Sequence, residues 1–204
     1  TGPGARPTLG VVTRSLPDDR PDDPATSTGS DAVADADPAT VTGGSAADDR
    51  GRIKVGVGEL AVATDESTLT TSGLGSCVAV ALVDERAGVR GLLHAMLPAG
   101  EDRTTAISRP AKYVDTGIDS LIGALDDAGA DPRRLEARVA GGAEMLDLTD
   151  AVGPRSVQRV GEVLDAAGVP VVASDVGDAV GRTVRFGPGG RLAVRAADGF
   201  ERVI

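Results

Sequence analysis

Hydrophobic residues begin to alternate with other residues in the segment 53–57, and a second apolar stretch follows at 60–63. A period of two residues predicts β-strands that bury one face. Further along the chain, the apolar runs 77–83 and 89–97 are separated by residues 84–88, a short polar turn that ends in glycine. Two apolar runs joined by such a turn predict a β-hairpin.

The spacing then changes to a helical repeat, which predicts two helices. The first is expected over 108–129, because a serine and a proline open it, hydrophobic residues share one face, and a glycine ends it. The hydrophobic positions on that face are Val114, Ile118, Leu121, Ile122 and Leu125. A second helix is predicted over 154–168, where a proline opens the repeat and a glycine closes it.

The remaining hydrophobic segments predict further strands around these helices. Residues 135–139 alternate as a strand, and 169–173 form a short apolar run that predicts a buried strand. The segments 183–186 and 192–195 flank a Pro-Gly-Gly turn at 188–190, which predicts a second hairpin. We therefore expect a single-domain α/β (α+β) fold, with mixed β-sheets packed together and the helices on the outside.

The first 50 residues differ from the rest of the chain. They are rich in Asp, Pro, Ala, Thr, Ser and Gly and show no sustained hydrophobic repeat. Such a segment cannot bury enough apolar surface to offset the entropy lost on ordering. We expect residues 1–50 to be a disordered acidic tail and residues 51–204 to be the folded domain.

The composition narrows the classes of partner. The formal net charge is -10, which argues against nucleic acid, against anionic membranes and in favour of protein partners. Acidic residues are mostly Asp and basic residues mostly Arg, which is typical of a high-salt cytoplasm but also of a GC-rich genome. No apolar run is long enough to cross a bilayer, and one cysteine cannot form an internal disulfide. We therefore expect a cytoplasmic protein in a reducing compartment.

The chain has one cysteine and one histidine, and both fall on the first predicted hairpin. Cys77 and His94 would lie on neighbouring strands, so they could form a catalytic dyad or be ordinary buried residues. Gly73, Gly75 and Ser76 precede the thiol, and a loop of small residues can present backbone N–H groups to an oxyanion. The same glycines could instead serve only a tight turn.

Two sequence blocks around these residues resemble the CheD family of chemoreceptor glutamine deamidases. They are GLGSCVAV at 73–80 and GLLHAMLP at 91–98. The resemblance extends over about 53–196, and it implies that Cys77, His94 and Thr71 are the catalytic residues, with Thr71 orienting the imidazole.

The match has two departures from the family pattern. The family commonly shows Gly-x-Arg-Asn where residues 153–156 read Gly-Pro-Arg-Ser, and a Gly-Gly pair where residues 177–178 read Gly-Asp. Neither change falls on the three catalytic positions. Both could alter loops that dock a substrate or partner.

The resemblance also implies a reaction and its partners. Cys77 would attack a receptor glutamine, His94 would move the protons, and pairing with His94 would lower the pKa of the thiol. Chemoreceptors and the CheC-type phosphatase are the implied partners, and the alternative to catalysis is a regulatory adaptor that binds both. No cofactor or metal is expected. A serine hydrolase based on Ser76, a zinc site and a dinucleotide site at 56–58 each lack part of their usual motif.

Overall fold

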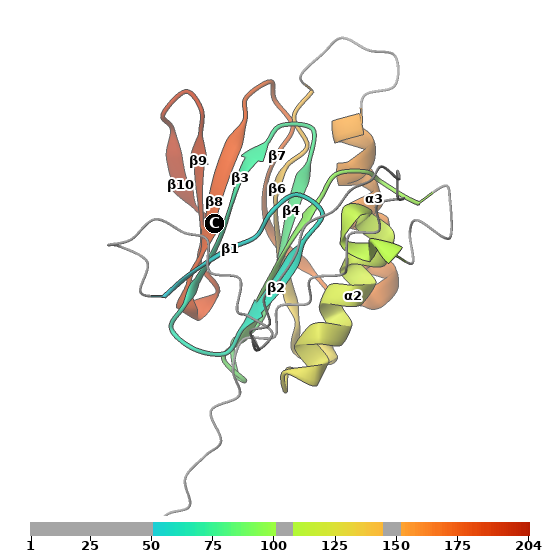
Figure 1. Cartoon of the computed structure of the whole chain (residues 1–204), viewed down its shortest axis with the longest axis vertical. Helices are drawn as coiled ribbons and strands as arrows, with labels where there is room; N and C mark the ends of the chain where they lie inside the picture. The colour runs from blue at the N-terminus through green and yellow to red at the C-terminus, as the bar shows by residue number, and fades with distance from the viewer. Residues whose placement is uncertain (1–50, 101–107, 145–151) are drawn as a thin grey trace, which may run out of the picture.

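Two β-sheets and two long helices form three layers in the computed structural model, which describes residues 51–100, 108–144 and 152–204 (Figure 1). One sheet lies between the other sheet and the helices. This arrangement confirms the predicted α/β class with mixed sheets and external helices. Residues 1–50 lie outside the described residues, so the acidic tail and its boundary at residue 50 stay predictions.

The sheet farther from the helices, here called the outer sheet, has the strand order β1-β3-β8-β9-β10. Its strands are β1 (Arg52–Lys54), β3 (Thr68–Leu74), β8 (Arg182–Phe186), β9 (Leu192–Ala196) and β10 (Glu201–Val203). β1 pairs with β3 in parallel, and the other neighbours are antiparallel. The predicted hairpin of 183–195 is confirmed as β8 and β9, whereas β10 was not predicted.

The sheet in the middle, here called the central sheet, has the order β2-β5-β4-β6-β7. Its strands are β2 (Leu60–Ala63), β4 (Val78–Asp84), β5 (Val89–Ala95), β6 (Glu136–Gly141) and β7 (Val171–Val176). β4 and β5 form the predicted hairpin, with Ala79 opposite His94. Among the described strands of this sheet, only β6 and β7 are parallel neighbours.

Both helices pack on the face of the central sheet that points away from the outer sheet (Figure 1). They are α2 (Val114–Asp127) and α3 (Val152–Ala167), and short 3-10 segments occur at Pro110–Lys112, Pro132–Arg134 and Pro188–Gly190. The hydrophobic repeat thus predicted both helices. The first begins at Val114, later than expected, because the proline near its predicted start lies in a separate 3-10 turn.

Side chains of β4 alternate between two hydrophobic cores. Val78, Val80 and Leu82 pack with the helices, whereas Ala79, Ala81 and Val83 pack against the outer sheet. Every residue of β4 is buried, as expected for a strand covered on both faces. Residues of β5 that lie opposite the alanines therefore also face the space between the sheets.

Two predictions about strands need correction. The small residues at 71–77 are predicted as a loop that leads to the thiol, but 71–74 belong to β3, which pairs with both β1 and β8. Residues 169–173 were predicted as a buried strand, but β7 starts at Val171 and lies at the edge of the central sheet. Val171 and Val172 are 42% and 46% exposed, because no strand covers that edge within the described residues.

A buried carboxylate closes the end of the central hairpin. Asp84 is 0% exposed and accepts hydrogen bonds from the N–H groups of Arg86, Ala87 and Asp131 at 2.9–3.1 Å. The guanidinium of Arg134 donates two more, at 3.2 and 2.7 Å. The hydrogen bonds from Arg134 lower the pKa of Asp84 to about 2 against the opposing effect of burial, with further lowering by the backbone donors.

Replacing Asp84 with alanine is expected to lower the free energy of unfolding by about 2–3 kcal/mol, because three backbone N–H groups and the Arg134 guanidinium lose a buried acceptor. A depressed pKa means that the carboxylate stabilises the fold above the ordinary Asp pKa and that this contribution is lost as pH falls toward about 2. Urea denaturation at pH 7 and pH 3 measures both effects. Asp127→Ala, at an exposed position, is the control, and equal losses in the two variants would contradict the prediction.

Candidate active site

His94 is fixed on β5 in the space between the two sheets. Its position opposite Ala79 places its side chain on the face that packs against the outer sheet, and it is 0% exposed. Its N–H donates to the Glu59 carbonyl at 3.0 Å, and its carbonyl accepts from the Gly58 N–H at 2.8 Å. Both bonds hold the backbone of the histidine to the segment 58–59, which leads into β2.

Thr71 reaches the same space from the outer sheet. It is 2% exposed, lies opposite Val184 of β8, and its Oγ1 is 2.7 Å from Nδ1 of His94. The other ring nitrogen, Nε2, is buried and makes no hydrogen bond within the described residues. The threonine thus holds the ring through Nδ1 and leaves Nε2 available for proton transfer.

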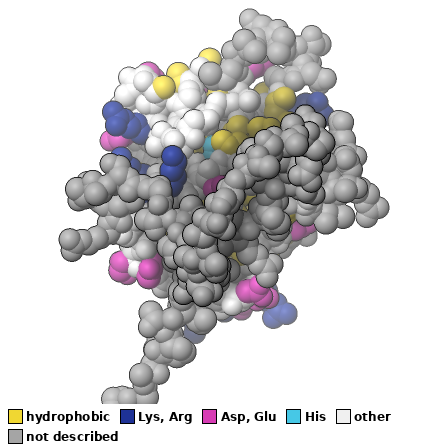
Figure 2. Space-filling view, in the orientation of Figure 1, with side chains coloured by type: hydrophobic (Ala, Val, Ile, Leu, Met, Phe, Trp, Pro, Cys, Tyr) yellow, Lys and Arg dark blue, Asp and Glu magenta, His cyan; other side chains and the backbone are white. Residues whose placement is uncertain are grey.

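Cys77 directly precedes β4, whose first residue, Val78, pairs with Ala95. Ala95 is the next residue after His94, so the cysteine lies close to the histidine along the hairpin. It is half-buried and packs against the core between the sheets, which is also the face that carries His94. Figure 2 shows the histidine only as a small spot beside a hydrophobic patch, in keeping with its burial. The structure therefore brings the predicted cysteine, histidine and threonine to one end of the space between the sheets.

The segment Gly75–Cys77, here called the cysteine loop, is anchored by the turn Gly141–Ala143 that ends β6. The Gly142 N–H donates to the Cys77 carbonyl and the Ala143 N–H to the Gly75 carbonyl, both at 2.8 Å. Gly141 has φ +105°, and a Cβ atom there would overlap the Cys77 carbonyl oxygen. The signal for this turn in the sequence is a pair of adjacent glycines at the end of a predicted strand.

The three predicted oxyanion-loop residues have different surroundings. Gly73 belongs to β3 and lines a groove of about 610 Å³ on the solvent-facing side of the outer sheet. The Gly75 N–H donates to the Gly73 carbonyl at 3.0 Å, so it is already used. The N–H groups of Ser76 and Cys77 have no backbone acceptor within the described ranges. Gly73 and Gly75 are therefore poor oxyanion donors, and Ser76 remains a candidate beside Cys77.

Burial shifts both titrating groups toward their neutral forms. Burial raises the pKa of the Cys77 thiol above its ordinary value, although its own backbone N–H opposes this shift. Burial lowers the pKa of His94, against a smaller opposing effect of the Glu59 charge. The expectation of a lowered thiol pKa was therefore wrong for the resting site, because desolvation disfavours a charged pair there. Both shifts favour the neutral thiol and the neutral imidazole.

Within the described ranges, no group of three or more His, Cys, Asp or Glu side chains is arranged to hold a metal ion. None of the helices in that part of the chain is long and apolar enough to span a membrane.

The sequence of the chain is similar to those of known proteins of one family. Residues 96–196 match the profile described as CheD chemotactic sensory transduction. The probable chemoreceptor glutamine deamidase CheD of Haloarcula marismortui is 47% identical over 138 residues, which cover 66% of this chain and 79% of that protein. The chain belongs to the CheD family. The profile match begins two residues after His94 and so does not include the three site residues. Their assignment is based on the geometry and on the resemblance of their sequence motifs.

Other CheD proteins are similar over comparable lengths. The chemoreceptor glutamine deamidase CheD of Bacillus subtilis is 38% identical over 141 residues, covering 67% of this chain and 85% of that protein. The protein of the same name from Halalkalibacterium halodurans is 38% identical over 158 residues, covering 74% of this chain and 98% of that protein. The similarity therefore extends over most of the length of each of these CheD proteins.

Proposed function

We propose that this CheD family member hydrolyses the side-chain amide of glutamine residues in chemoreceptors and converts them to glutamate. The observation that carries the proposal is the 2.7 Å contact between Thr71 and Nδ1 of His94, with a buried and unpartnered Nε2 on the same face as Cys77. A thiol, a base and a group that orients the base are the components of cysteine-based amide hydrolysis.

In the proposed reaction, Nε2 of His94 accepts the Cys77 proton while Sγ attacks the amide carbon and the carbonyl electron pair moves to oxygen. When the carbonyl re-forms, the C–N bond breaks, and His94 gives its proton to the departing nitrogen, which leaves as ammonia. His94 then takes a proton from water, and the hydroxide attacks the thioester. Collapse of that adduct releases glutamate and returns the proton to the thiol.

The first attack creates negative charge on the former carbonyl oxygen, which needs hydrogen-bond donors. We propose the N–H groups of Ser76 and Cys77, since neither has a backbone acceptor among the described residues. The diglycine turn at 141–143 donates to the carbonyls of Gly75 and Cys77 and so helps to set the direction of these N–H groups. Thr71 accepts the Nδ1 proton, which fixes the tautomer that leaves Nε2 basic.

The substrate and partners follow from the family. Relatives carry the name chemoreceptor glutamine deamidase, so chemoreceptors are the proposed substrates and chemotaxis the proposed process. A CheC-type phosphatase is proposed as a regulatory partner from the resemblance alone. If the chain were only an adaptor for receptors and this phosphatase, it would bind them without turnover, and measured deamidation separates the two functions.

The test is mass spectrometry of a receptor cytoplasmic fragment incubated with the protein. We expect specific glutamines to become glutamates and ammonia to be released in equal amount, and we expect no change with Cys77→Ala. Unchanged glutamines after incubation with folded wild-type protein would reject the proposed activity. Binding of the fragment without turnover would favour the adaptor function.

The pH dependence of kcat/KM should show a plateau bounded by the two shifted groups. A lowered His94 pKa places the acid limb below the ordinary imidazole pKa of about 6.5, because the protonated ring cannot accept the thiol proton. A raised thiol pKa places the alkaline limb above the ordinary value for cysteine. Labelling of Cys77 by iodoacetamide should rise along the same alkaline limb. Rapid labelling well below neutral pH would instead show a preformed thiolate.

A further inference from the structure

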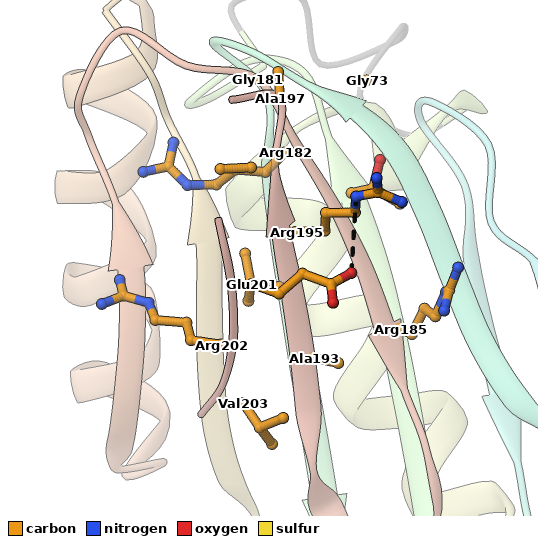
Figure 3. Close-up of a pocket in the computed structure, with 13 residues that line it drawn as sticks. Gly73, Gly181, Arg182, Arg185, Ala193, Arg195, Ala197, Glu201, Arg202 and Val203 are labelled. Carbon is orange, nitrogen blue, oxygen red and sulfur yellow. Dashed lines mark ion pairs between the residues drawn. The ribbon is translucent and has the colours of Figure 1, made fainter. Parts of the chain in front are cut away.

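Arg182 is a buried arginine at the start of β8, outside the catalytic trio. Its side chain is 1% exposed, and its Nε donates to Oδ1 of Asp175 on β7 at 2.8 Å. Arg202 donates to the other oxygen of Asp175 at 2.6 Å. Figure 3 shows the side chains of Arg182 and Arg202 extending toward the same side. The two arginines thus share one carboxylate.

Arg182 differs from Arg202 in what else it contacts. Its Nη1 donates to the carbonyls of Gly177 and Val180, at 2.9 and 3.0 Å. These residues bound a turn in which Asp178 has φ +56°, a conformation that a residue with a side chain adopts at a cost. No such carbonyl contact is found for Arg202 in the described residues. One guanidinium therefore braces a strained turn.

The turn at 177–180 is hydrogen-bonded to the diglycine turn at 141–143 and to the residue after it. The Gly177 N–H donates to the Gly141 carbonyl at 3.0 Å, and the Asp178 carbonyl accepts from the Glu144 N–H at 2.8 Å. These bonds lie on either side of Gly142 and Ala143, the residues that donate to the cysteine loop. A continuous set of hydrogen bonds thus runs from Arg182 to the Cys77 carbonyl.

The backbone of Arg182 reaches the other end of the same loop. Arg182 pairs with Leu74 in the ladder between β3 and β8, just beyond a bulge after Ser72. Leu74 is fully buried and directly precedes Gly75, the first residue of the cysteine loop. Arg182 therefore supports the loop on its N-terminal side through the strand and on its C-terminal side through the turns.

We infer that Arg182 is a positioning residue for Cys77, which sets the direction of the thiol and of the loop N–H groups without touching the substrate. The inference rests on the proposed deamidase activity for its kinetic consequence. A displacement of about 1 Å at a nucleophile can cost on the order of 10²-fold in rate. Because the loop is only reoriented, substrate binding should change little.

The experiment compares Arg182→Ala with Arg202→Ala, which removes a guanidinium from the same carboxylate but no carbonyl contact. With a receptor fragment as substrate, Arg182→Ala should lower kcat by about 10- to 100-fold, with KM within about threefold of wild type. Arg202→Ala should stay within about threefold in both. Arg182→Lys keeps the charge beside Asp175 but has one nitrogen in place of Nε and Nη1, so it cannot bond Asp175 and both carbonyls together, and its kcat should lie between the two.

Amide hydrogen exchange gives a second measurement that does not depend on activity. In Arg182→Ala, exchange at Gly142 and Ala143 should rise at least about tenfold, while exchange at Val80 and Leu82 in the core of β4 should stay as in wild type. Equal exchange at Gly142 and Ala143 in both alanine variants would overturn the inference. So would a parallel rise at the core amides, which would indicate general destabilisation.

The two proposals fail in different ways. If wild-type protein does not deamidate the receptor fragment, the proposed function is wrong, but the exchange data still decide whether Arg182 holds the loop. If wild type is active and Arg182→Ala has the kcat of Arg202→Ala, the positioning role is wrong and the activity stands.

Discussion

Replacing Cys77 or His94 with alanine is expected to lower kcat/KM for glutamine deamidation by at least about 10³-fold, because each takes part in bond making or proton transfer. Thr71→Ala should cost only about 10- to 100-fold, since the hydroxyl orients the imidazole through its 2.7 Å contact. Receptor-fragment deamidation followed by ammonia release measures all three variants.

The buried position of His94 calls for a second variant, because alanine leaves a cavity between the sheets. His94→Gln keeps most of the volume and a group that can bond to Thr71, but it provides no base at neutral pH. Its activity should be as low as that of His94→Ala, while its melting temperature stays closer to wild type. Activity of His94→Gln near the wild-type level would contradict the role of the imidazole.

Gly141→Ala should also cause a large loss of activity, for a reason that involves only the backbone. A Cβ at this position would overlap the carbonyl oxygen of Cys77, so the cysteine loop must move. We expect kcat/KM to fall by about 10²-fold or more. Stability should fall as well, because φ is +105° there and only glycine adopts such a conformation readily.

Gly129→Ala is the matched control for this change. Gly129 has φ +97°, nearly the same as Gly141, but nothing lies within 4 Å of the position that a Cβ would occupy. It should lose about 1–2 kcal/mol of stability from the unfavourable φ, with kcat/KM within about twofold of wild type. Circular dichroism verifies that both variants fold. Similar kcat/KM in the two folded variants would show that the contact with Cys77 is unimportant.

Regular hydrophobic periodicity predicted the long elements well. The central hairpin has two continuous apolar runs, and both helices have hydrophobic residues at helical spacing, so their positions follow from burial on two faces or one. β3 escaped prediction because its inward residues include a threonine, and because the bulge after Ser72 moves the next inward residue from position 73 to Leu74. A bulge interrupts the period of two on which strand prediction depends.

The candidate site was predicted only in part, for a similar reason. The motif residues Cys77, His94 and Thr71 were identified from sequence, and the structure brings them to one place. The thiol pKa could not be inferred, because it depends on burial between two sheets whose packing the sequence pattern does not describe. The contribution of Arg182 depends on bonds between segments far apart in the chain, which no local pattern contains.

Thr71 and His94 belong to different sheets, although they are only 23 positions apart in the chain. Neither sheet alone contains the complete pair, so the proposed catalytic pair can form only after the two layers have docked during folding. Recovery of deamidation would then report the docking of the two sheets, whereas circular dichroism reports the formation of strands and helices. In refolding experiments we expect recovery of activity to lag behind the recovery of secondary structure.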